Sequence, residues 1–143
     1  MPKKSTSPTQ RSLAKLRAEG FTAWIAERWN PFAKNRQDLG GFGDILAWKA
    51  GVGVLAIQTT TTAHQAARLA KIAGNPKAEE WIRAGAGLHV HGWVARKVKR
   101  GGQAKRWDCT VREVTLADFH PGTLVAVLDC HEEPEIDAAE VPF

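Results

Sequence analysis

The sequence has no tyrosine, two cysteines among its 143 residues, and no long apolar run. Cys109 and Cys130 lie 21 positions apart with no CxxC pair, so neither a disulfide framework nor a zinc finger is supported. The longest apolar run, 51–57, is far shorter than the ~20 residues that a membrane helix needs. The basic first residues are followed by polar ones and not by the apolar stretch of a secretory signal. We therefore expect an intracellular, cytoplasmic protein with no membrane partner.

Basic residues are absent from the last part of the chain. All 20 Lys and Arg fall within residues 1–115 beside eight acids, a net charge of +12, whereas the last 28 residues carry seven acids and no Lys or Arg. A small basic domain attracts polyanions, and nucleic acid is the first candidate because each phosphate contact releases counterions. A merely solvated basic surface is the alternative.

Composition indicates one globular domain with tails. The chain is 43% hydrophobic and long enough to bury a core. We expect a disordered basic tail over residues 1–8, a single domain over 9–128 and a flexible acidic tail over 129–143. The acidic tail is expected to lie over the basic face as a phosphate mimic and to weaken DNA binding at low salt. Deletion of residues 130–143 tests this hypothesis.

The residue pattern predicts an α/β fold with the element order αβββααββ. A basic amphipathic helix is expected over 9–19, ended by Gly20. A loop is expected over 31–43, and a Thr62–Gln65 capping box is expected to open the second helix. The other helices are predicted over 62–73 and 77–84, and the strands over 21–29, 44–48, 54–60, 88–98 and 107–114.

Polar side chains interrupt two neighbouring apolar segments. Asp44 opens one predicted strand, and Gln58 and Thr60 share a face of the next because side chains alternate along a strand. Carboxylate and amide oxygens are ligands for hard divalent cations, so this group can hold one beside a scissile phosphate. The structural alternatives are that Asp44 caps a turn and that Gln58 and Thr60 form a hydrogen-bonded polar patch.

With these residues, the stretch from Arg11 to Trp93 resembles the PD-(D/E)XK nuclease superfamily, particularly its small phage and archaeal Holliday-junction-resolvase-like members. The basic first helix, the segment from Gly41 to Ala47, the strand ending Ile57–Thr60 and the helix behind it carry the resemblance. It implies an αβββαβ restriction-endonuclease-like core with a mixed central sheet flanked by helices. It also implies Mg²⁺ or Mn²⁺ as the cofactor and a phage or prokaryotic host.

The resemblance assigns site residues by position. Asp44 matches the family's Asp, Gln58 its second acid and Thr60 its Lys, so the last two depart from the motif. Gln58 still offers a carbonyl ligand, but Thr60 lacks the cation that would orient water and stabilise the charged phosphate. The implied metal ligands are Asp44 and Gln58, with Glu27 or Asp38 as a second carboxylate.

Other basic residues are candidates for the missing cation of the motif: Lys34, Arg36 or Lys71. Lys34 is our first candidate as a catalytic residue. Two acids also have plain structural interpretations, because Glu27 can form a surface ion pair with Arg28 and Asp38 can solvate its loop.

The predicted nucleic-acid contacts are basic residues from three parts of the chain: Arg11, Lys15, Lys34, Arg36, Arg96, Lys97, Lys99, Arg100, Lys105 and Arg106. Those over 96–106 form a hairpin tip that can clamp a duplex backbone, the alternative being a solvated turn. Of the six tryptophans, Trp29 and Trp107 are the best candidates to stack on unpaired bases, and most of the others are expected in the core.

His89 and His91 alternate on one predicted strand and share a face. No third ligand lies at a fixed spacing, so paired surface or groove histidines are favoured over a zinc site.

Together these patterns predict a metal-dependent DNA endonuclease that hydrolyses phosphodiester bonds, selective for branched DNA as the resemblance implies, and active as a homodimer. One alternative is a catalytically degenerate nuclease fold that only binds DNA. A third hypothesis is a protein-interaction domain whose basic body pairs with an acidic partner.

Overall fold

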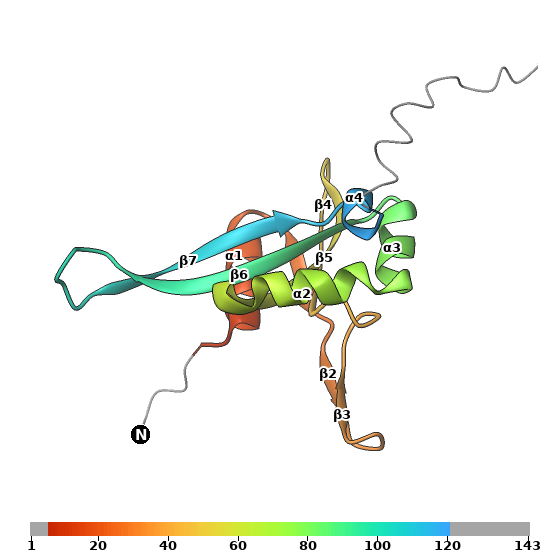
Figure 1. The fold of residues 1–143 in the computed structure, drawn as a ribbon, viewed down its shortest axis with the longest axis horizontal. Helices are drawn as coiled ribbons and strands as arrows, with labels where there is room; N and C mark the ends of the chain where they lie inside the picture. The colour runs from red at the N-terminus through yellow and green to blue at the C-terminus, as the bar shows by residue number, and fades with distance from the viewer. Residues whose placement is uncertain (1–5, 121–143) are drawn as a thin grey trace, which may run out of the picture.

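Five strands form one mixed sheet with helices on both of its faces (Figure 1). The computed structural model describes residues 6–120. All neighbouring strands are antiparallel except β5 and β6, which are parallel. The α/β class with a mixed central sheet and flanking helices is therefore confirmed. The strand order is β1 (Thr22–Ile25), β4 (Ile45–Lys49), β5 (Gly53–Thr61), β6 (Gly87–Lys97) and β7 (Lys105–Glu113).

Helix α1 (Pro8–Ala18) covers one face of the sheet. The Ser7 side chain caps its first turn by accepting a hydrogen bond from the Gln10 N–H, and Gly20, at φ 90°, allows the chain to turn back. Leu13 and Leu16 pack into a buried cluster with apolar residues of β1, β4 and β5. The predicted amphipathic helix is confirmed to within one residue at each end.

The opposite face is covered by a short 3₁₀ turn, η1 (Thr62–His64), followed by α2 (Gln65–Ala73) and α3 (Pro76–Arg83). A last helix, α4 (Leu116–Phe119), contacts α3. The predicted Thr62–Gln65 capping box is wrong. Gln65 is buried, and its amide donates to the carbonyls of Val90 and Thr110 at 3.1 and 2.9 Å, so tertiary hydrogen bonds take the side chain that the box would use.

The segment after β1 leaves the sheet as a separate antiparallel hairpin, formed by β2 (Arg28–Asn30) and β3 (Asn35–Gln37). We call residues 28–37 the β2–β3 arm, which projects from the body in Figure 1. The predicted single strand over 21–29 and loop over 31–43 are therefore wrong. The N–H groups of Ala26 and Glu27 donate to the Asp44 carbonyl at 2.8 and 3.3 Å, which ends the pairing of β1 and directs the chain outward.

Strands β6 and β7 confirm the two long strands predicted near the end of the domain. Their pairing runs from His89↔Glu113 to Lys97↔Lys105, whereas β5 pairs with β6 only as far as Trp93. Beyond Trp93 the hairpin is two-stranded and extends away from the body (Figure 1).

Most tryptophans lie outside the core, contrary to expectation. Trp93 is buried, but the side chains of Trp24, Trp29, Trp48 and Trp107 are exposed. Cys130, His131 and the whole predicted acidic tail lie outside the described residues, as do residues 1–5 at the basic start of the chain. Within residues 6–120, no helix has the length and apolar character to cross a bilayer.

Candidate functional site

Asp44 lies where the β2–β3 arm joins the central sheet. Its N–H donates to the Ile57 carbonyl at 2.9 Å, and its own carbonyl accepts the two N–H groups at the root of the arm. The main chain is therefore held from both sides. Only 6% of Asp44 is exposed.

One oxygen of the Asp44 carboxylate is bound by three donors. Oδ2 accepts from Gln58 Nε2 at 2.8 Å, from the Thr59 N–H at 2.8 Å and from Thr59 Oγ1 at 3.1 Å. These partners come from β5, so Asp44 does not act as the cap of a local turn. Among residues 6–120, no side-chain hydrogen bond engages the other oxygen, Oδ1. Oδ1 is the oxygen available to a ligand.

The electrostatic surroundings of Asp44 favour a nearby cation. Burial raises the pKa of its carboxyl above the ordinary value, and the hydrogen bonds from Thr59 partly offset that rise. The negative charges of Glu27 and Asp38 raise the pKa further. A cation close to Asp44 would relieve this repulsion.

The two outer carboxylates have local partners. Glu27 pairs with Arg36 across the arm at 3.3 Å, not with Arg28, and Asp38 Oδ1 accepts the Gly41 N–H at 2.9 Å. Within the described part of the chain, no three His, Cys, Asp or Glu side chains are arranged as a complete metal-binding group. Mg²⁺ needs only one or two carboxylates, since water and substrate phosphates complete its shell. Asp44 Oδ1 is one carboxylate oxygen that such a shell could use.

Gln58 and Thr60 share one face of β5, as the alternation predicts: their Cα partners on β6 are Val90 and Gly92. Gln58 directs its amide N–H to Asp44, so it supports the carboxylate as a donor.

Thr60 lines a hollow of about 370 Å³ together with residues of η1 and α2, namely His64, Ala67, Arg68 and Lys71. This hollow, which we call the α2 hollow, places two cations beside the position where the family motif has its lysine. Lys71 was among the predicted substitutes. His64 and Arg68 were missed, although His64, Arg68 and Lys71 follow one another at intervals of four and three residues, the spacing of one helix face.

Lys34 is not brought to Asp44. It lies in the turn beyond Asn30↔Asn35, the last pair of the arm, and has a positive φ of 52°. The root of the arm, at the opposite end, is the part that contacts Asp44. Lys34 therefore lies at the tip of the arm, at the end opposite to Asp44.

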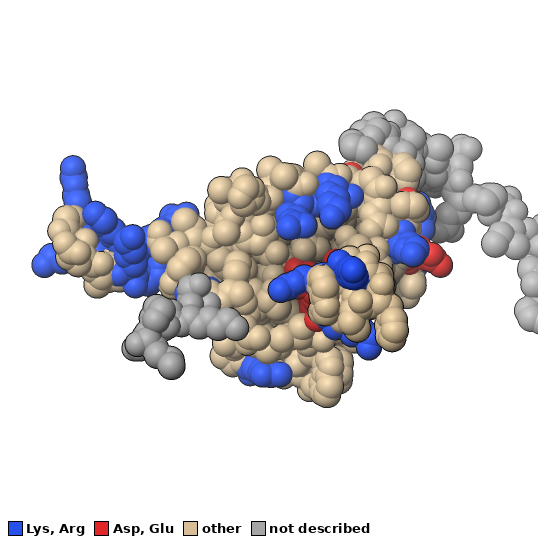
Figure 2. All heavy atoms as spheres, turned by 90° about the horizontal axis from the view of Figure 1, so that it is seen from below, with Lys and Arg blue, Asp and Glu red and all other residues tan. Residues whose placement is uncertain are grey.

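Figure 2 shows acidic side chains beside the β2–β3 arm and basic side chains on several sides of them, with a second basic group at the far end of the β6–β7 hairpin. In that hairpin Arg96 faces Arg106 and Lys97 faces Lys105, and only Asp108 offsets them, at 3.6 Å from Arg96 and 3.2 Å from Arg106. Like charges directly opposite destabilise a hairpin. Their concentration at a projecting end favours an interaction with a polyanion. Lys99 and Arg100 lie in the turn between the strands.

The two basic residues predicted on α1 are already engaged. The Arg11 guanidinium lies 3.8 Å from the centre of the Trp107 ring, and Lys15 pairs with Glu19. Trp107 is thus partly covered on one face, which leaves Trp29 as the better placed of the two predicted stacking residues.

His91 is buried beneath α1, and it lines a hollow of about 190 Å³ together with His89 and residues of α1, as expected for a pair of groove histidines. Ser12 Oγ accepts from Trp93 Nε1 at 2.8 Å and is hydrogen bonded to His91 Nδ1 at 2.8 Å. Burial lowers the pKa of His91 to about 4, which keeps the ring neutral. The Cα partner of His91 on β5 is Thr59, whose N–H binds Asp44, so His91 lies beside the Asp44 site.

His89, Cys109 and His120 also belong to no metal-binding group among the described residues. Burial lowers the pKa of His89 and raises that of the Cys109 thiol to about 11. A thiol so rarely ionised is a poor nucleophile and a poor metal ligand. His120 contacts Glu79 at 2.7 Å.

No family model matches the chain, and no curated protein or solved structure shows significant similarity to it. We therefore infer the function from the geometry of the site and from the distribution of charge.

Proposed function

We propose that this protein is a metal-dependent DNA endonuclease of the PD-(D/E)XK type. The observation that carries the proposal is the buried Asp44 carboxylate, with Oδ2 held by β5 and Oδ1 without a side-chain hydrogen bond among the described residues. The element order supports it: apart from the β2–β3 arm, η1 and α3, the chain runs α1, β1, β4, β5, α2, β6, which is the αβββαβ order of the core that the resemblance implies.

Asp44, with Glu27 or Asp38, would hold Mg²⁺ or Mn²⁺, which when bound polarises the scissile phosphate and lowers the pKa of water. Gln58 and Thr59 keep the Asp44 carboxylate in one orientation. In the reaction, water adds its oxygen to phosphorus in line with the P–O bond that breaks; the water loses one proton to solvent, and the leaving oxygen keeps the electron pair of the broken bond and takes up a proton, which gives one phosphate end and one hydroxyl end.

Arg68 and Lys71 take the role of the motif's lysine in this proposal. Both line the α2 hollow beside Thr60. A fixed positive charge there stabilises the negative charge that develops on the phosphate oxygens, which is where electrostatic catalysis has its largest effect. The β6–β7 hairpin tip and the arm hold the DNA backbone further away.

The test is a cleavage assay on labelled single-stranded, duplex, flap and four-way-junction DNA with Mg²⁺, Mn²⁺ or EDTA. We expect metal-dependent cutting that is lost in Asp44→Asn, reduced in Lys71→Ala and retained in Glu80→Gln, which removes an exposed acid of α3. Cutting that survives Asp44→Asn, or a wild-type protein that neither cuts nor binds DNA, overturns the proposal.

A DNA-binding module without activity is the second candidate. Two observations favour it: Gln58 satisfies Asp44 as a neutral donor, and Thr60 stands in place of the motif's lysine. Tight, salt-sensitive binding with no cutting in either metal identifies this alternative.

A further inference from the structure

We propose that the β2–β3 arm stacks unpaired DNA bases on its two exposed rings, Trp29 on one side of the hairpin and Phe32 on the other, so that the substrate is DNA with a single-stranded segment next to the cleavage site. This inference rests on the proposed function and adds the substrate class. It is carried by aromatic exposure, by the charge of the arm and by the position of the arm relative to Asp44.

The arm presents aromatic rings that the described part of the chain does not cover. Phe32 is 96% exposed and Trp29 is 58% exposed. A single exposed aromatic is ordinary on a protein surface, but two within four residues on a projecting hairpin make an apolar surface that costs hydration until it is covered.

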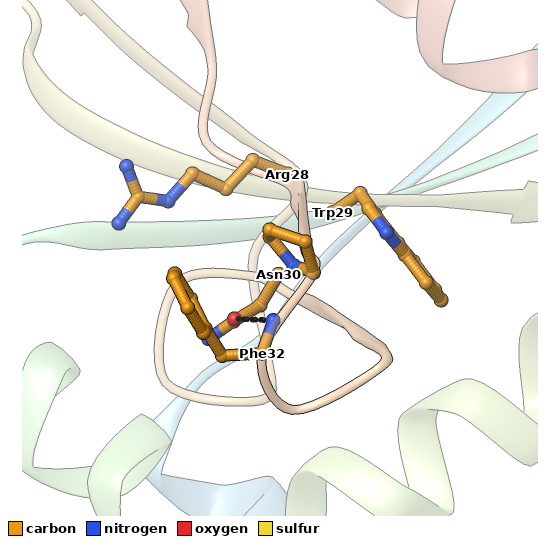
Figure 3. A pocket seen from close by; sticks show the side chains of 5 residues that line it. Arg28, Trp29, Asn30 and Phe32 are labelled. Carbon is orange, nitrogen blue, oxygen red and sulfur yellow. Dashed lines mark hydrogen bonds between the residues drawn. The ribbon is translucent and has the colours of Figure 1, made fainter.

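The side chain of Asn30 holds the turn that carries Phe32. Asn30 Oδ1 accepts the N–H groups of Phe32 and Ala33 at 3.0 and 3.2 Å. Together with Arg28, Trp29 and Pro31, Asn30 and Phe32 line a hollow of about 290 Å³ (Figure 3). The figure shows Arg28 and Phe32 on one side of the hairpin and Trp29 on the other. A pre-formed turn of this kind lowers the entropy lost when a planar ligand binds.

The charge of the arm points to nucleic acid as the occupant. Residues 28–37 include three cations, Arg28, Lys34 and Arg36, and no acid. Trp29 faces Arg36 across the two strands, so an aromatic ring and a guanidinium are neighbours on one face. Aromatic side chains that receive bases, interleaved with cations that follow the phosphates, are the usual means of binding single-stranded DNA. Bases inside a duplex are stacked on one another and cannot reach such rings.

The arm also lies at a suitable distance from the carboxylates. Its root is hydrogen bonded to the Asp44 carbonyl. The three residues of β2 span roughly 10 Å at about 3.3 Å each, a length of about three base steps of a DNA strand. A base stacked near the tip would therefore place the phosphate a few nucleotides along the strand near Asp44.

The experiment measures binding in EDTA, so that it does not depend on cleavage. The probes are a duplex, a single strand and a splayed-arm DNA with 2-aminopurine at the first unpaired position. The test variant is Trp29→Leu/Phe32→Leu. The matched control is Trp24→Leu, which removes a tryptophan that is 68% exposed on β1, outside the arm. Circular dichroism and urea unfolding verify that each variant is folded.

We expect the test variant to lose about tenfold or more in affinity for splayed and single-stranded DNA, as the removal of base–aromatic stacking predicts. The 2-aminopurine quenching should disappear with it, while duplex affinity stays unchanged and the control behaves as wild type. Equal losses on duplex and splayed DNA, or no loss at all, overturn the inference. Unchanged DNA binding with a changed oligomeric state also overturns it and assigns the arm to a protein contact.

The two proposals fail in different ways. Wild-type protein that binds splayed DNA through the arm but cuts nothing in Mg²⁺ or Mn²⁺ removes the nuclease and leaves the arm inference standing. Protein that cuts duplex and splayed DNA equally, with unchanged cutting in the arm variant, removes the arm inference alone.

Discussion

The side-chain amide of Gln58 donates a hydrogen bond to Oδ2 of Asp44 at 2.8 Å, from β5 to the residue that precedes β4. The two residues are 14 positions apart in the sequence. The bond keeps a buried carboxylate in place without adding a second negative charge, so the site is assembled before any cation binds. Substitutions of Gln58, Thr59 and Thr9 therefore test how the Asp44 carboxylate is held.

Gln58→Glu should make the fold depend on divalent cations. The change replaces a donated hydrogen bond by a second carboxylate beside Asp44. We expect a loss of about 1–3 kcal/mol in the free energy of unfolding in EDTA, the usual cost of leaving a buried charged group unpaired. Mn²⁺ or Mg²⁺ should recover most of it. Urea denaturation with and without the metal measures both values.

Gln58→Met is the matched control for that test, because it removes the donor and adds no charge. Its free energy of unfolding should not respond to Mn²⁺. If Gln58→Glu is destabilised equally with and without the metal, Asp44 and residue 58 do not face a common cation site.

Thr59→Val should weaken the hold on Asp44. Thr59 Oγ1 donates to Asp44 Oδ2 at 3.1 Å, and it lies 2.8 Å from the Thr9 hydroxyl, which therefore donates to it. Loss of these bonds should cost about 1–2 kcal/mol of stability. Thr59 acts as a positioning residue, so kcat for DNA cleavage should also fall while KM changes little.

Thr9→Val should cost less stability than Thr59→Val, since it removes only the hydrogen bond between Thr9 and Thr59 and leaves the one from Thr59 to Asp44. The double variant should cost less than the two single changes combined, because both remove the same hydrogen bond. Strict additivity in urea denaturation would show that Thr9 and Thr59 are not coupled.

Acid should destabilise the fold through His91. The pKa of this buried ring is lowered to about 4 from an ordinary value of 6.5, so the unfolded chain takes up its proton at a higher pH than the native protein. The contribution is fully present above pH 6.5 and is lost as the pH falls from 6.5 toward 4. His91 can change the free energy of unfolding by about 3 kcal/mol at most, because its pKa differs by roughly 2.5 units between the unfolded and native states and one unit corresponds to about 1.36 kcal/mol.

Urea denaturation at several pH values between 7 and 4 measures this loss. His91→Asn keeps an acceptor for Ser12 without the titrating ring and should flatten the curve. The control His64→Asn alters an exposed histidine and should leave the curve as in wild type. An unchanged slope in His91→Asn would mean that other groups cause the acid sensitivity.

The β6–β7 hairpin tip should contribute affinity for DNA without sequence preference. Lys97→Ala/Lys105→Ala removes two cations that face each other. The slope of log affinity against log salt should fall by roughly 0.9 for each phosphate that the double variant no longer binds, with similar decreases on every duplex sequence. The hairpin itself should not be destabilised, because the change also relieves like-charge repulsion.

Lys77→Ala is the control for the hairpin tip, since Lys77 is exposed on α3. Fluorescence anisotropy titrations at several salt concentrations measure each slope. A slope that is the same in wild type and in the Lys97/Lys105 double variant would remove the hairpin from the DNA-binding surface.

Local regularity made much of the fold predictable. The apolar spacing of α1 and the residue patterns of β5, β6 and β7 predicted these elements to within two residues at each end. The β2–β3 arm was not predictable in this way. Its strands are only three residues long and mostly exposed, so they carry no pattern of burial that separates them from a loop.

The sequence by itself determined which side chains can share a surface: Gln58 with Thr60 on one face of β5, and His89 with His91 on one face of β6. Both follow from the period of two in a strand. Only the tertiary structure decided what those side chains meet. It joined Gln58 to Asp44, placed Arg68 and Lys71 beside Thr60, and buried His91 against Ser12. The reason is that periodicity is a local property of the backbone, whereas these contacts depend on how separate elements pack.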